Sequence, residues 1–168
     1  VIVTYNRLSL LKECITAVKA QTSPVHRIYV IDNNSTDGTF EFLENFALDS
    51  QVKVISLTEN IGGAGGFARG IKEAVIAGAD WVWVMDDDTI PYDDALEKML
   101  RAIDLTQDVG YVCSKVLWTD GTPHRMNVPG YFIGKQKETL YNAFSNGDTP
   151  AFLIQHASFV SLLINGGA

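Results

Sequence analysis

Short apolar runs alternate with segments of helical periodicity along most of this 168-residue chain. The runs are rich in valine and isoleucine, as in buried strands, and between them apolar residues recur every three or four positions, as on one face of a helix. Strands that alternate with helices predict an α/β fold whose mostly parallel sheet is covered by helices on both faces. Because the sequence shows no internal repeat and no inter-domain linker, we expect residues 1–168 to form a single domain.

The expected strands are short and apolar, and most of them end at a polar turn. They cover residues 1–3, 28–31, 52–57, 81–85, 111–117 and 159–164. The expected helices cover residues 8–18, 40–46, 67–77 and 95–103, and a glycine-rich loop from Asn60 to Gly66 leads into the third. Residues 123–150, rich in Gly, Asn and aromatic side chains, are expected to form an irregular, loop-built binding region.

Composition narrows the classes of partner and compartment. With 46% hydrophobic residues the chain can bury a substantial core. Its net charge of −7 does not indicate the basic surface that binds nucleic acid. No stretch approaches the roughly 18 apolar residues of a transmembrane span. Cys14 and Cys113 lie in apolar runs, so we expect buried core residues in a reducing compartment, and the cytoplasm is the expected location.

Three adjacent aspartates, Asp86 to Asp88, follow the apolar strand at 81–85 directly. Parallel sheets bind ligands at the carboxyl ends of their strands, and three neighbouring carboxylates repel one another unless a cation or water compensates them. If strand geometry persists, Asp86 and Asp88 share one face and suit Mg²⁺ or Mn²⁺, which prefer oxygen ligands. The alternative is a solvated acidic turn that caps the next helix.

The glycine-rich segment is a candidate for close approach to a ligand. Glycine lets the backbone come near an anion, and the N-terminus of the following helix favours negative charge. Gly63-x-Gly65-x-x-Ala68 also fits a dinucleotide fingerprint, but it follows the third strand rather than the first, which disfavours a dehydrogenase. Arg69, in the first turn of the expected helix, is a candidate phosphate ligand. A purely structural loop and an exposed surface arginine are the alternatives.

Two further polar segments follow apolar strands, and the parallel sheet should bring them beside the aspartates. One is Thr4-Tyr5-Asn6-Arg7, and the other begins at Asp32. The Asp32 carboxylate could accept a hydrogen bond from a base imide or a ribose hydroxyl. Its alternative role is to close its own turn, as aspartates at strand ends often do.

Four ordered motifs resemble those of glycosyltransferase family two. They are VIVTYNR at residues 1–7, IDNNSTDGT at 31–39, NIGGAGG at 60–66 and MDDD at 85–88. The doubled glycines and the triple aspartate are most similar to the galactofuranosyltransferase and rhamnosyltransferase-like branch. The resemblance extends over residues 1–118 and implies a Rossmann-like type A glycosyltransferase fold and inversion at the anomeric carbon.

The resemblance also assigns roles to particular residues. Thr4, Tyr5 and Arg7 would border the nucleobase, and Asp32 would hold the base or ribose. The sugar-diphosphate channel would be lined by Asn60, Gly62, Gly63 and Arg69. Asp86 and Asp87 would contact the nucleotide sugar, and Asp86 and Asp88 would bind Mg²⁺ or Mn²⁺. The implied donor is a UDP- or dTDP-linked sugar, galactofuranose- or rhamnose-like. The implied acceptor is a glycan or a lipid-linked glycan, which adds peripheral association with the inner face of the membrane as a second expected location.

The family's general base follows the strand that matches residues 159–164. This chain begins at Val1 without an initiator methionine and stops at Ala168, so we expect a domain truncated at both ends, with the base beyond Ala168. Two other functions remain open. One is a nucleotide-binding module without catalysis. The other is a nucleotidyltransferase, although that class usually carries a basic glycine-rich loop after its first strand.

Overall fold

The computed structural model describes residues 1–46, 48–104, 108–127, 129, 154 and 156–167. In chain order the elements are β1 (Ile2–Thr4), α1 (Leu8–Lys19), β2 (Ile28–Asp32), α2 (Thr39–Glu44), β3 (Val52–Ser56), α3 (Gly62–Ile76), β4 (Trp81–Asp86), α4 (Ala95–Ile103), β5 (Tyr111–Cys113), the 3-10 helix η1 (Arg125–Asn127) and β6 (Leu162–Asn165). Within the described ranges, the helices are all too short or too polar to cross a membrane. Most of the loop-built region expected at 123–150 lies outside the described residues.

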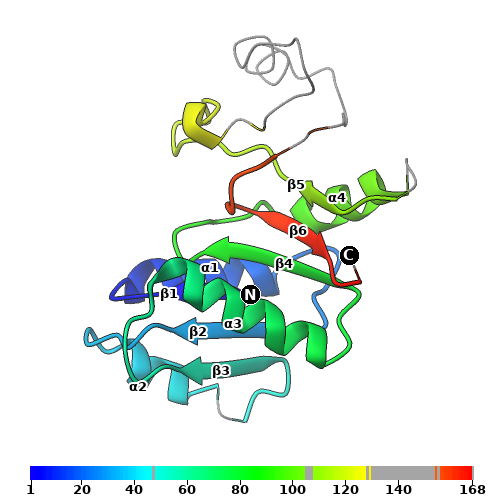
Figure 1. The fold of residues 1–168 in the computed structure, drawn as a ribbon. Coiled ribbons are helices and arrows are strands. Elements are labelled where there is room, and N and C mark those ends of the chain that lie inside the picture. Colours follow the sequence, from blue (N-terminus) through cyan, green and yellow to red (C-terminus); the bar gives the residue numbers. More distant parts are fainter. Residues whose placement is uncertain (47, 105–107, 128, 130–153, 155, 168) are drawn as a thin grey trace.

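Six strands form one sheet in the order β3-β2-β1-β4-β6-β5 (Figure 1). The first four are parallel, whereas β6 runs antiparallel to both β4 and β5. Thr4 lies opposite Asp32, and Val3 lies opposite Asp86, so the carboxyl ends of β1, β2 and β4 are level with one another. The predicted α/β fold with a mostly parallel sheet is confirmed.

The core occupies both faces of the sheet because successive strand residues point to opposite sides. Ile2 belongs to the cluster that packs under α1, α2 and α4, and Val3 belongs to the cluster under α3. In Figure 1, α3 crosses in front of the sheet and α1 lies behind it. Fully burying side chains of this size contributes about 1.5–3 kcal/mol each, so the short β1 is held by its neighbours on both faces.

The two cysteines are isolated from each other, as the sequence predicted. Cys14 is fully buried between α1 and the sheet, and burial raises the pKa of its thiol to about 12. Cys113 is half-buried in β5, and burial raises its pKa to about 11. Both thiols therefore stay protonated at neutral pH and act as small apolar residues.

The expected glycine-rich loop at 60–66 is wrong, because α3 already begins at Gly62. Two glycines of α3, one in the expected loop and one after it, are explained by helix–sheet packing. A Cβ on Gly66 would lie 2.7 Å from Val3 Cγ1, and one on Gly70 would lie 3.1 Å from Ile31 Cγ1. Glycine thus lets α3 approach the central strands more closely than a side chain would allow. The strands at the other edge also differ from expectation, since β5 ends at Cys113 and β6 starts only at Leu162.

Gly66→Ala should destabilise the domain although alanine is the better helix former. Overpacking against Val3 costs about 1–3 kcal/mol, which exceeds the roughly 1 kcal/mol that alanine gains in a helix. Gly63→Ala is the matched control, since a Cβ there meets nothing within 4 Å. Urea unfolding of both variants tests the packing argument. An equal or higher stability of Gly66→Ala than of Gly63→Ala would contradict it.

Candidate functional site

The carboxyl edge of the parallel strands brings together three segments that are distant in sequence, as predicted. The Thr4 hydroxyl, at the end of β1, donates a buried hydrogen bond of 2.7 Å to Oδ2 of Asp87, just after β4. On the other side of β1, the Asn33 backbone N–H donates to the Thr4 carbonyl at 2.9 Å. Thr4 therefore joins the ends of β2 and β4, and it is only 1% exposed.

The loops after β1 and β2 are fastened by reciprocal hydrogen bonds. The Asn6 N–H donates to Ser35 Oγ at 3.0 Å, and Asn6 Oδ1 accepts from the Thr36 N–H at 2.7 Å. Asn6 has φ 54°, in the left-handed region that asparagine tolerates better than most residues. These bonds fix the backbone from which Tyr5 and Arg7 project.

Asp37 links the starts of two helices. Its Oδ2 accepts from the Leu8 N–H at 3.0 Å, at the beginning of α1, and its Oδ1 accepts from the N–H and hydroxyl of Thr39, at the beginning of α2. Burial opposes ionisation of this carboxyl, but the hydrogen bonds from Thr39 and Leu8 outweigh it and lower its pKa. The bonds to Thr39 are local, whereas the bond to α1 depends on a partner 29 residues away and leaves no sequence signal.

The acidic triplet does not continue the strand. β4 ends at Asp86, and the Thr89 N–H closes a turn on the Asp86 carbonyl at 3.2 Å. The expectation that strand geometry places Asp86 and Asp88 on one face is therefore wrong. Asp87 is 4% exposed and points back to Thr4, whereas the Asp88 side chain is 48% exposed.

Two carboxylates of the triplet, Asp86 and Asp87, lie where their negative charge is disfavoured. Burial, followed by repulsion from Asp88 and Asp87, raises the pKa of Asp86. Burial also raises the pKa of Asp87, although the hydrogen bond from Thr4 and the charge of Arg7 oppose the shift. Arg7 Nη1 lies 3.5 Å from Asp87 Oδ1 and 2.5 Å from Asp88 Oδ2. Its guanidinium thus contacts two of the three carboxylates rather than an open space beside Tyr5.

Asp32 and Asn33 lie side by side at the end of β2, and both are buried. Asp32 Oδ1 accepts from the Ser35 N–H at 3.0 Å, so the alternative role in its own turn is present for this oxygen. Asn33 Oδ1 accepts from the Ile61 N–H at 3.0 Å and ties β2 to the start of α3. The sequence gives no signal for this role of Asn33, because Ile61 lies 28 residues further along the chain.

The start of α3 faces the same edge but differs in detail from expectation. Asn60 Oδ1 accepts from the Gly62 N–H at 2.8 Å, and Gly62 adopts φ 76°, which a side chain would disfavour. Gly63 has open space around its Cα. Arg69 is not in the first turn, because the helix begins seven residues earlier, and its guanidinium pairs with Glu73 at 3.2 Å.

The residues present fit a divalent cation that is shared with a ligand. No group of three or more Asp, Glu, His or Cys side chains in the described part of the chain converges to enclose a metal ion. Mg²⁺, however, is usually held by one or two carboxylates together with substrate phosphates and waters. Asp86 and Asp88 offer such oxygens, and Thr89 Oγ1 beside them is buried without a hydrogen-bond partner among the described residues.

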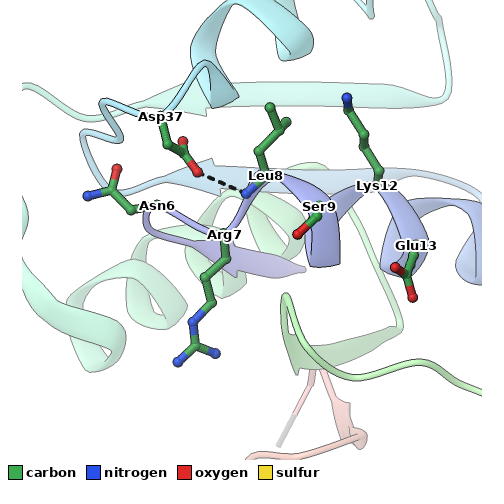
Figure 2. Close-up of a pocket in the computed structure, with 7 residues that line it drawn as sticks. All are labelled: Asn6, Arg7, Leu8, Ser9, Lys12, Glu13 and Asp37. Atoms are coloured by element: carbon green, nitrogen blue, oxygen red, sulfur yellow. Dashed lines mark hydrogen bonds between the residues drawn. The ribbon is translucent and has the colours of Figure 1, made fainter.

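An open groove adjoins this edge at the start of α1 (Figure 2). It is lined by Asn6, Arg7, Leu8, Ser9, Lys12, Glu13 and Asp37. Figure 2 shows the Arg7 side chain extending away from Asp37 and Lys12, on the opposite side of the helix start. Arg7 therefore lines the groove, and its guanidinium contacts Asp87 and Asp88 of the acidic triplet.

Asp86→Asn should raise the stability of the metal-free protein, because it removes a half-buried charge that its neighbours repel. A gain of about 1 kcal/mol corresponds to roughly 2–4 °C in melting temperature for a domain of this size. Asp80→Asn, an exposed residue just before the other end of β4, is the control for the change in net charge. Thermal unfolding in EDTA measures both. A melting temperature below that of the unaltered protein would show that Asp86 is stabilised by contacts rather than strained.

Comparisons with known proteins agree with this geometry. The sequence matches Glycosyl transferase family 2 over residues 1–161. It is 33% identical over 129 residues to galactofuranosyltransferase GlfT1 of Mycolicibacterium smegmatis, covering 77% of this chain and 42% of that protein. It is 31% identical over 145 residues to the dTDP-rhamnosyl transferase RfbG of Shigella flexneri, covering 84% of this chain and 46% of that one. The chain thus spans less than half the length of these two relatives.

Solved structures show the same fold. TarS 1-349 of S. aureus in complex with UDP superposes with a TM-score of 0.68 at 18% identity, over 99% of this chain and 46% of that one. The mannosyltransferase PcManGT of Pyrobaculum calidifontis, in complex with GDP-Man and Mn²⁺, superposes with a TM-score of 0.56 at 24% identity, over 68% of this chain and 34% of that one. The fold is the type A glycosyltransferase fold, and by its sequence match this chain belongs to glycosyltransferase family 2.

Proposed function

We propose that this domain binds a nucleoside diphosphate sugar together with Mg²⁺ or Mn²⁺ and forms the donor-binding part of an inverting glycosyltransferase. The observation that carries the proposal is the convergence of Thr4, Asp32 and the triplet on one sheet edge. The negative charges of Asp86 and Asp87 are disfavoured there, and the positive charge nearby does not fully compensate them. An acidic edge binds an anionic diphosphate only if a cation lies between them. The cation, when bound, supplies Lewis-acid stabilisation of the charge on the departing diphosphate.

The chain's own residues bind and orient the donor. Tyr5, 46% exposed directly after β1, offers a ring against which a base can stack. Thr4 fixes the orientation of Asp87, the middle residue of the triplet, by its hydrogen bond. Asp32 would accept a hydrogen bond from the base or ribose. The start of α3, at Asn60, Gly62 and Gly63, would lie along the sugar diphosphate because its open glycine backbone leaves room for it.

The relatives support a finer assignment of the donor and acceptor. One is a galactofuranosyltransferase and another a dTDP-rhamnosyl transferase, which favours a UDP- or dTDP-linked galactofuranose- or rhamnose-like donor. The proposed acceptor is a glycan or a lipid-linked glycan. Arg69 is a weaker candidate for the diphosphate than the sequence indicated, because Glu73 already neutralises it.

UDP or dTDP with Mn²⁺ should stabilise the domain, whereas NAD should not. A ligand at 100 times its dissociation constant adds about 2.7 kcal/mol by mass action, or roughly 5–10 °C in melting temperature. The shift in melting temperature is measured with UDP, dTDP, UDP-galactofuranose, dTDP-rhamnose and NAD, each in Mn²⁺ and in EDTA. Equal stabilisation by UDP in excess EDTA would exclude the cation from the proposed site.

Asp32→Asn should narrow the preference for uracil over cytosine. Losing a charge-assisted hydrogen bond to the imide N–H should weaken UDP binding by about 1.5–3 kcal/mol, while the new amide can donate to the cytosine ring nitrogen. The amide oxygen can still accept from the Ser35 N–H, so the turn should survive. Calorimetric titration of UDP and CDP against both proteins gives the ratio. An unchanged ratio would remove Asp32 from the base site.

A further inference from the structure

Arg7 occupies a position that the sequence did not assign to it. Its guanidinium contacts Asp87 and Asp88, which follow it by about eighty residues in the chain. The three aspartates and the arginine together carry two negative charges in excess. The Arg7 and Asp88 side chains are each about half exposed, at 51% and 48%, so water reaches their ion pair.

The backbone around Arg7 is fixed by its neighbours, whereas its side chain is half exposed and held only by ion pairs. Asn6, on one side, is bonded to Ser35 and Thr36, and Leu8, on the other, donates its N–H to Asp37. Exposed ion pairs contribute little stability, so the guanidinium can leave Asp88 at small cost. Asp87 stays in place when this happens, because its other oxygen is held by Thr4.

We propose that Arg7 is a positioning residue that holds Asp87 and Asp88 as an internal counter-ion and competes with the divalent cation for them. The inference rests on the proposed function, since it presupposes a cation at the triplet. A guanidinium and a divalent cation repel each other, so pairing of Asp88 with one of them weakens its pairing with the other. The metal-free protein therefore keeps its carboxylates ordered, and the cation has to displace a resident positive charge before it binds.

If Arg7 competes with the cation, removing its charge should strengthen metal binding rather than weaken it. Arg7→Gln removes the competing positive charge and keeps hydrogen-bonding capacity. It should strengthen binding of Mn²⁺ alone by roughly three- to tenfold, which is the change in affinity expected from losing one exposed ion pair and one repelling charge. Arg101→Gln is the matched control. It changes the net charge equally, but Arg101 lies on α4 and pairs with Glu97. It should leave Mn²⁺ affinity unchanged, which separates local competition from overall charge.

Calorimetric titration of the whole chain with Mn²⁺, with and without UDP, tests the inference, and water-proton relaxation by bound Mn²⁺ gives an independent reading. Thermal unfolding supplies a second one, since Arg7→Gln should melt below the unaltered protein in EDTA and gain more from added Mn²⁺. Equal or weaker Mn²⁺ binding by Arg7→Gln, in a protein that otherwise binds Mn²⁺ with UDP, would overturn the role of Arg7 and leave the proposed function standing. Absence of Mn²⁺ binding in every protein, even with UDP, would overturn both.

Discussion

Three residues, Ile2 to Thr4, form a strand that pairs in parallel with β2 on one side and β4 on the other. The positions of the candidate site residues after these three strands depend on this double pairing. Parallel pairing makes strands end at the same edge of the sheet, so the polar residues after β1, β2 and β4 meet although long helical crossovers separate them. The strand is too short to be stable by its own hydrogen bonds. It is held by its apolar faces, since Ile2 and Val3 pack into opposite cores, and by Thr4, which reaches Asp87 through its hydroxyl.

The same edge carries two carboxylates, Asp86 and Asp87, whose charge is not fully compensated by the described contacts around them. Burying Asp87 and half-burying Asp86 costs free energy, and the strain shows as raised pKa values of both carboxyl groups. A fold selected for stability alone would place neutral side chains there. Charged groups that are kept close together despite mutual repulsion are typical of functional sites, because a ligand of opposite charge then binds to groups already in position. A cation bound as proposed would relieve this repulsion, and its binding would then be coupled to stability.

Much of the fold could be read from the sequence because hydrophobic periodicity is a local property. The strand ending at Asp86 and the helix at 8–18 follow from spacing alone, and parallel pairing then places Asp32 near the triplet. The start of α3 could not be read, since glycine is a poor helix former and its benefit at Gly66 lies in contact with Val3, far away in sequence. The turn after Asp86 was only the alternative to continued strand geometry, because alternation along a strand does not indicate where the strand stops. Asn33 was missed for the same reason as Gly66, since its role lies in a contact with Ile61 rather than in its neighbours.

Arg7 shows most clearly how a long-range contact changes the meaning of a motif. By sequence order it belongs with Thr4 and Tyr5, and the resemblance places all three beside the base. The structure separates them, since Thr4 and Arg7 both reach the aspartates while Tyr5 remains exposed. Thr4 contributes a neutral hydrogen bond that can persist when a cation binds, because Asp87 uses a different oxygen for Arg7. Arg7 contributes charge, and charge of the same sign as the cation has to move. Under the proposed competition, Thr4 would hold the site with or without the cation, whereas the position of the Arg7 side chain would differ between the two states.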